Sequence, residues 1–130
     1  MGNLRDIGDV TPLRVWQGVS GRTIEGERIT MALVELEPSA VVPEHRHPNE
    51  QLGMVIRGAL TFRIGQEERA LGPGGTWRIL ANEPHEVRVG PEGASVMDVF
   101  SPIREDWHAL PTDPEVRSAW PPAQAARTGT

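Results

Sequence analysis

The 130-residue sequence contains no cysteine, no lysine and no tyrosine. Without cysteine, the chain cannot form disulfides, bind zinc or an iron–sulfur cluster through thiolates, or use a cysteine nucleophile. Because all thirteen basic residues are arginine, Schiff-base chemistry and the anchoring of pyridoxal phosphate on a lysine are excluded as well. Catalytic or metal-binding side chains must therefore come from His, Asp, Glu, Arg, Ser, Thr, Asn and Gln.

Long apolar runs and an excess of positive charge are also absent. No segment approaches the roughly eighteen apolar residues that a membrane span needs, and the first residues lack the pattern of a signal sequence. Thirteen basic against eighteen acidic residues give a net charge of −5, which argues against a nucleic-acid or membrane-surface partner. We therefore expect a cytoplasmic protein.

Turn-forming residues, in contrast, are frequent. Fourteen glycines and twelve prolines are spread along the chain, and short β-branched and apolar segments recur between them. Their spacing of about eight to twelve residues is typical of an antiparallel sandwich or closed barrel. We expect one all-β domain over residues 1–110. Its expected strands are 15–19, 28–36, 41–47, 51–57, 59–64, 68–71, 76–80, 85–89 and 95–100.

The composition changes after the last expected strand. Residues 104–110 are polar and aromatic without β-branched residues, which predicts one short helical turn. Residues 111–130 are rich in Pro and Ala, as in a tail that lies on a surface or reaches a neighbouring subunit. Some strands, such as the one with Leu52, Met54 and Ile56, are apolar on both faces. We expect a homodimer that buries the outer face, or else a tail that covers it.

Candidate metal ligands concentrate in residues 45–51, which read His-Arg-His-Pro-Asn-Glu-Gln. Alternate side chains of an extended strand point to the same side, so His45 and His47 could reach one metal ion. Gln51 is the first residue of the next expected strand, and the alternation of that strand would point its side chain inward. His85 could add a further nitrogen from a later strand. The alternative is a solvated His-x-His strand without any ligand role.

This ligand set suits one divalent ion, such as Zn, Ni, Mn or Fe. Three neutral imidazoles and a glutamine oxygen add no negative charge, so the ion would keep its Lewis acidity. A weak glutamine ligand would also leave positions open for water or substrate. The spacing alone does not select one of these metals.

The order of these residues closely resembles the two motifs of the cupin superfamily. The first motif is His-x-His-x3-Gln-x6-Gly over residues 45–58, and the second begins Pro-Gly and ends Asn-x-Pro-His over residues 73–85. The resemblance covers about residues 28–102. It implies a cupin-type antiparallel β-barrel (jelly roll), usually dimeric, with one divalent metal in its mouth. The sequence departs from the usual motifs at Ser39, Leu80, Asn82, Val89 and, where the family commonly has Glu, Gln51.

Residues 97–107, with the sequence MDVFSPIREDW, carry a narrower resemblance. Together with the first motif they look like the cupins of pectin and alginate breakdown that open unsaturated uronate rings. In that group an Asp, a Phe and an Arg at this spacing lie near the metal. The resemblance thus implies Asp98 as the catalytic residue, and Phe100 and Arg104 as substrate-binding residues.

The residues themselves agree with this assignment. Period-two alternation places Asp98 and Phe100 on one face of the last expected strand. A carboxylate beside a cation suits proton transfer, and Arg104 could bind a sugar carboxylate through two hydrogen bonds. Each residue also has a plainer interpretation. Asp98 could form a surface salt bridge, Phe100 could be an ordinary core residue, and Arg104 could be a solvated charge. Arg57 has inward parity but could simply reach water, and Trp77 could line a sugar pocket or pack in the core.

The sequence therefore predicts a metal-dependent cupin that acts on a small, anionic carbohydrate acid by non-redox ring opening. Two alternatives remain open, an iron-dependent cupin dioxygenase and a small-molecule-binding cupin without turnover. Asp98 and Arg104 favour ring opening, because an oxygenase has no general need for that pair.

Overall fold

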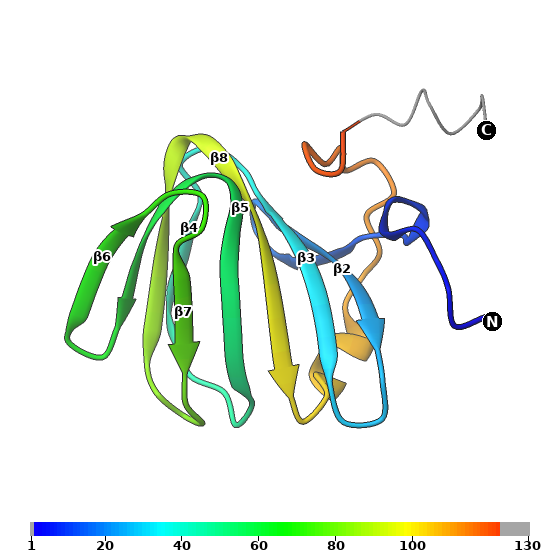
Figure 1. Cartoon of the computed structure of the whole chain (residues 1–130), viewed down its shortest axis with the longest axis horizontal. Coiled ribbons are helices and arrows are strands. Elements are labelled where there is room, and N and C mark those ends of the chain that lie inside the picture. The colour runs from blue at the N-terminus through cyan, green and yellow to red at the C-terminus, as the bar shows by residue number, and fades with distance from the viewer. Residues whose placement is uncertain (1, 123–130) are drawn as a thin grey trace.

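The computed structural model describes residues 2–122, which form an eight-stranded antiparallel sheet (Figure 1). This confirms the predicted all-β fold class. Two short 3-10 helices accompany the sheet, and η2 confirms the helical turn expected after the last strand. The elements in chain order are η1 (Ile7–Asp9), β1 (Leu13–Trp16), β2 (Val19–Glu25), β3 (Thr30–Leu36), β4 (Val41–His45), β5 (Glu50–Ile64), β6 (Glu67–Leu71), β7 (Thr76–Ile79), β8 (His85–Ser101) and η2 (Glu105–Ala109).

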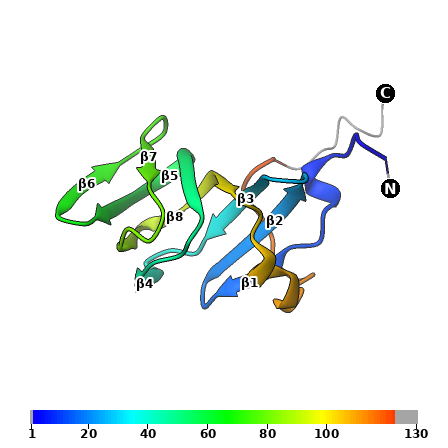
Figure 2. The same ribbon diagram turned by 90° about the horizontal axis from the view of Figure 1, so that it is seen from below.

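The sheet folds into two layers because β5 and β8 are long and belong to both. The first layer contains β1, β2, β3, the second half of β8, the first half of β5 and β7. The second layer contains β4, the first half of β8, the second half of β5 and β6. In the view from below, β7 and β4 lie on opposite sides of the molecule (Figure 2).

The bend between the layers lies at two glycines that face each other. Gly58 has a φ of +83° and Gly93 a φ of +76°, both in the left-handed region that favours glycine. A Cβ on Gly58 would overlap the carbonyl oxygen of Gly93. We predicted turns at these points that separate pairs of strands. Instead, the ladder continues through the bend with irregular register, so 51–57 and 59–64 are one strand, as are 85–89 and 95–100.

Other strands also differ from the prediction. The expected strand 15–19 is interrupted at Gly18, whose φ of +76° makes the turn between β1 and β2. Most of β2 was missed because its residues are largely polar and lack a clear alternation. β4 ends at His45 and not at residue 47, since the chain leaves the ladder before the following proline.

The hydrophobic core fills the space between the two layers. Its buried side chains come from the inward positions of the strands and include Val34, Val55, Phe62, Ile79 and Val96. The described part of the expected tail packs beside the barrel. Thr112 forms a bridge with Leu13, Asp113 accepts from Arg14, and the amide of Ala119 donates to Glu35 at 3.1 Å. Residues 123–130 of that tail lie outside the described residues.

An apolar surface remains on the outside of the first layer. Met31, Val99 and Leu52 are cross-strand neighbours in one row across β3, β8 and β5, and Met97 and Met54 are neighbours in the next row. Leu52 is 52% exposed and Met54 is 45% exposed, so the described part of the tail does not cover them. None of the helices within residues 2–122 is long and apolar enough to cross a membrane.

Candidate metal centre

Three histidines converge at one end of the barrel, where β4 ends and β8 begins. His45 and His85 are cross-strand partners in the β4–β8 ladder, and His47 comes from the loop after β4. One ligand atom from each lies within 4.8 Å of the others, so the cluster could hold a metal ion. The sequence predicted that these residues meet. His47 joins them through the loop, however, and not through alternation along one strand.

Backbone hydrogen bonds fix which nitrogen of each ring carries the proton. In all three histidines Nδ1 lies 2.8–3.0 Å from a backbone carbonyl oxygen two residues away. A carbonyl oxygen only accepts, so Nδ1 must be the donor, and Nε2 of the neutral ring keeps its lone pair. This arrangement is the usual one for metal-binding histidines, because the carbonyl orients the ring.

The buried atoms of the cluster are suited to a cation. Nε2 of His85 is buried and has no hydrogen-bond partner among the described residues. An unsatisfied buried nitrogen is unfavourable, and a divalent ion would satisfy its lone pair. Burial lowers the pKa of His85 to about 4 and also lowers the pKa of His47. Both rings are therefore neutral near pH 7, in the form that binds metals.

Gln51, at the start of β5, fits as a fourth ligand. Its amide nitrogen donates to Oδ1 of Asp98 at 2.9 Å, so its Oε1 must be the atom that lies 3.0 Å from Nε2 of His47. Since that Nε2 also carries a lone pair, two acceptors face each other. Two ligand atoms at about 2.1 Å from one ion and at right angles would be about 3.0 Å apart. A shared divalent ion is thus compatible with this pair.

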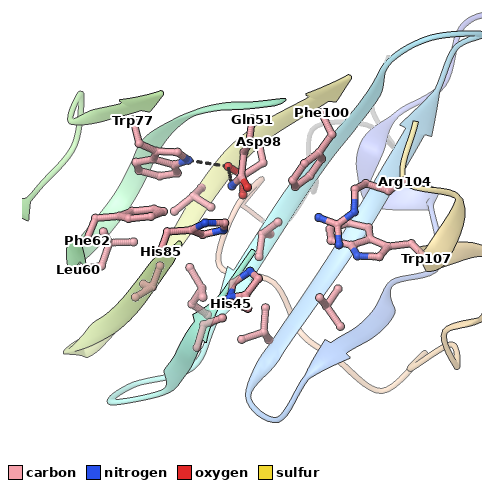
Figure 3. A pocket seen from close by; sticks show the side chains of 17 residues that line it. His45, Gln51, Leu60, Phe62, Trp77, His85, Asp98, Phe100, Arg104 and Trp107 are labelled. Carbon is pink, nitrogen blue, oxygen red and sulfur yellow. Dashed lines mark hydrogen bonds between the residues drawn. The ribbon is translucent and has the colours of Figure 1, made fainter. Parts of the chain in front are cut away.

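Asp98 lies beside the histidine cluster on β8. Its side chain is buried, and its Oδ1 accepts hydrogen bonds from Gln51 at 2.9 Å and from Nε1 of Trp77 at 2.8 Å (Figure 3). Burial raises the pKa of Asp98 to about 6, although these hydrogen bonds and the charge of Arg104 act in the opposite direction. The structure thus places the predicted carboxylate inside the barrel, not at a surface salt bridge.

Arg104 lies across the cavity from Trp77, between aromatic rings (Figure 3). Its guanidinium carbon is 4.7 Å from the ring centre of Phe100 and 4.6 Å from that of Trp107. Nε and Nη2 donate to the carboxylate of Asp106 at 3.1 and 2.9 Å. Nη1 has no side-chain hydrogen-bond partner within residues 2–122, so this end of the buried guanidinium is available to donate to an anionic group.

These residues surround one cavity of about 110 Å³. Its inner part is apolar, with valines and leucines from both layers. A second hollow, of about 520 Å³, lies on the outside near β6 and β7 and is lined by Arg69 and Arg78 among others. Phe62 and Trp77 line both spaces and so separate them. Six of the seven predicted site residues line the inner cavity: His45, Gln51, His85, Asp98, Phe100 and Arg104.

Arg57 is not part of this site, contrary to its predicted inward parity. A bulge between Val55 and Arg57 shifts the register by one residue and turns the side chain outward. There Arg57 donates to Ser95 at 3.2 Å and forms an ion pair with Glu35 at 3.2 Å. It therefore stabilises the outer face of the first layer.

Asn49 was missed by the sequence analysis. Its side-chain nitrogen donates to the carbonyl oxygens of Pro102 at 2.7 Å and Ile103 at 3.2 Å, and its own carbonyl accepts from His47. It thereby ties the loop that carries His47 to the segment that precedes Arg104. The Pro-Asn pair indicated only an ordinary turn, so the sequence contained no signal for this role.

The chain is thus a small antiparallel barrel with three histidines in its mouth that are able to hold a metal ion. Comparison with known proteins specifies the class further: the cupin domain matches residues 32–100, and the chain belongs to the cupin family. It is 30% identical over 104 residues to the pectin degradation protein KdgF of Dickeya dadantii. The aligned region covers 78% of this chain and 94% of that protein.

Solved structures share the fold. KdgF from Halomonas sp. matches with a TM-score of 0.74 and 24% identity over 82% of this chain and 98% of its own. An RmlC-like cupin from Shewanella frigidimarina matches with a TM-score of 0.75 and 18% identity over 82% of this chain and 96% of its own. Oxalate decarboxylase from Bacillus subtilis matches with a TM-score of 0.68 and 21% identity over 82% of this chain and 32% of its own. These matches confirm the predicted cupin fold, which does not by itself define the reaction.

Proposed function

We propose that this cupin is a metal-dependent enzyme that opens the ring of unsaturated uronates without redox chemistry. The proposal rests on one cavity in which a histidine cluster, the buried carboxylate of Asp98 and the free end of Arg104 converge. The likeness to a pectin degradation protein over 78% of the chain supports uronates as the substrate class. Phe100 would pack against the sugar beside Arg104.

The metal would be held by Nε2 of His45, His47 and His85 and by Oε1 of Gln51. When bound, it supplies Lewis acidity that polarises a sugar oxygen. Asp98 takes the proton of the anomeric hydroxyl as the bond between the anomeric carbon and the ring oxygen breaks. The ring oxygen keeps the electron pair of that bond as an enolate, and Asp98 returns its proton to the far carbon of the double bond, which gives the linear keto form. The reaction is an isomerisation, so no oxidant or reductant is needed.

The direct test is an assay with the metal-loaded protein and an unsaturated uronate. Ring opening removes the conjugated double bond, so the ultraviolet absorbance of the sugar should disappear and NMR should show the linear product. Oxygen consumption with another substrate would favour an iron-dependent dioxygenase and overturn the proposal. Binding of the sugar without turnover would identify a binding protein instead.

Replacing Arg104 with Gln should weaken the binding of carboxylate substrates. A charge-assisted hydrogen-bonded pair contributes about 1.5–3 kcal/mol, which corresponds to a rise in KM of about ten- to a hundredfold. A neutral sugar analogue does not use the guanidinium, so its affinity should change little. Calorimetric titration of both ligands measures the difference. Equal losses for the two ligands would indicate that Arg104 only supports the fold.

We further propose that the protein is a homodimer through the apolar outer face of the first layer. Two-fold pairing would bury Met31, Leu52 and Met54, which are at least 37% exposed in one chain. Sedimentation should report about twice the chain mass of 14.3 kDa. Met54→Asp should give monomers, because it places a charge in the apolar contact. Ala70→Asp, on exposed β6 of the other layer, is the control, and a wild-type monomer at micromolar concentration would contradict the proposal.

A further inference from the structure

Trp77, Gly53 and Asp98 form one row across the first layer. Gly53 of β5 is the cross-strand partner of Trp77 in β7 and of Asp98 in β8. The two outer residues are two strands apart, with backbones about 10 Å from each other. Their side chains nevertheless meet above Gly53, where Nε1 of Trp77 donates to Oδ1 of Asp98 at 2.8 Å (Figure 3).

This contact depends on the absence of a side chain at residue 53. A Cβ there would overlap Nε1 of Trp77 and Oδ1 of Asp98. Unlike Gly58, Gly53 is not among the residues with a positive φ, so its backbone conformation does not require glycine. Glycine in a strand weakens it and often marks a close approach of other groups. Here it provides the space in which the indole reaches the carboxylate.

The indole is buried and packed against another ring in this position. Trp77 is only 5% exposed, and its ring lies 4.8 Å from that of Phe62, which in turn stacks near His85 at 6.3 Å. An indole N–H can only donate, so the atom that it contacts must remain an acceptor. The amide of Gln51 donates to the same atom, Oδ1 of Asp98. Oδ2 is thus the oxygen left available to a substrate.

We infer that Trp77 is a positioning residue, which together with Gly53 holds the carboxylate of Asp98 so that Oδ2 is its reactive oxygen. The inference rests on the proposed function and deepens it. Asp98 touches the substrate, whereas Trp77 acts through Asp98.

The first variant that tests this role is Trp77→Phe, which keeps an aromatic ring and removes the N–H donor. Loss of a hydrogen bond to a charged group should lower kcat for ring opening about ten- to a hundredfold. KM and metal content should stay near those of the wild type, because neither Arg104 nor the histidines change. A purely structural role would lower the folded fraction or the melting temperature, but it would leave kcat per folded molecule unaltered.

A second variant, Gly53→Ala, removes no polar group and only fills the space. Its methyl group displaces the indole from the carboxylate, so kcat should fall by a similar factor. The double variant Gly53→Ala/Trp77→Phe should be little worse than either single variant, since both remove the same contact. Gly72→Ala is the matched control, because no atom lies within 4 Å of a Cβ at that position and its φ is not positive.

An NMR measurement on the metal-free protein tests the contact independently of activity. Four tryptophans give four indole N–H signals, and the signal lost in Trp77→Phe belongs to Trp77. This signal should shift in Gly53→Ala and in Asp98→Asn but not in Gly72→Ala. If it does not shift, or if Trp77→Phe keeps the wild-type kcat, the inference is overturned. If the wild type opens no uronate, the proposed function fails, and with it the role of Trp77 in that reaction.

Discussion

Replacing Asp98 with Asn should lower kcat for ring opening by about a hundred- to ten-thousandfold, the usual cost of losing a general acid–base. Asn keeps an acceptor oxygen for Gln51 and Trp77, and it places an amide NH2 group where Oδ2 of the carboxylate was. The amide cannot take the proton of the sugar hydroxyl at neutral pH. Initial rates from the ultraviolet assay measure this loss, and elemental analysis should show an unchanged metal content.

The control is Asp113→Asn, the same chemical change in a carboxylate that pairs with Arg14 outside the cavity. It should leave the rate unaltered. If Asp98→Asn turns over at the wild-type rate, Asp98 is not the proton-transfer group. A loss of activity accompanied by loss of metal would instead mean that Asp98 acts mainly by orienting Gln51.

The second large effect is expected on metal binding. His47→Ala removes a buried side chain that we propose as a metal ligand and whose ring is already oriented by a backbone carbonyl. Removing a group that only orients a ligand typically costs about ten- to a hundredfold in metal affinity, so removing the ligand itself should cost more. Elemental analysis of the purified variant should therefore find little bound metal. The barrel should remain folded, because its stability comes mainly from apolar burial between the layers.

His108→Ala is the control for this experiment. His108 is the only histidine in the sequence outside the cluster, and its Nε2 lies 2.8 Å from Glu25 on the surface. This variant should keep its metal. Added zinc should raise the melting temperature of the wild type and of His108→Ala, but not of His47→Ala, since only a bound ligand stabilises the folded state. Full metal occupancy in His47→Ala would refute the ligand assignment.

The sequence predicted the location of the site because the relevant signals are local. The turn and proline positions place His45 and His85 at the ends of two strands, and the ladder pairs them directly. Period-two alternation placed Asp98 and Phe100 on one face of the strand, because the second half of β8 is regular as far as Phe100, and the structure shows that this face is the inner one.

The features that the sequence did not reveal depend on contacts between distant segments. Arg57 was assigned to the wrong face, since a bulge is a property of two paired strands and not of one. The hydrogen bond between Trp77 and Asp98 depends on how β5, β7 and β8 are aligned with one another, and neither residue type indicates this bond alone. Gly58 indicated a break between two strands for the same reason, because only its pairing with Ala94 in β8 shows that the ladder continues.

The wall formed by Phe62 and Trp77 has a consequence for how new substrates could arise. On its inner side lies a chamber of about 110 Å³, and on its outer side a larger hollow with two arginines. Under the proposed function, the length of an acceptable sugar would thus be limited by two aromatic side chains, and not by the ladder of the sheet. Shortening one of them would join the spaces into a channel that passes between the edges of the layers. A variant of this barrel that opens the uronate ring as proposed would then take longer acidic chains without any change to His45, His47, Gln51 and His85.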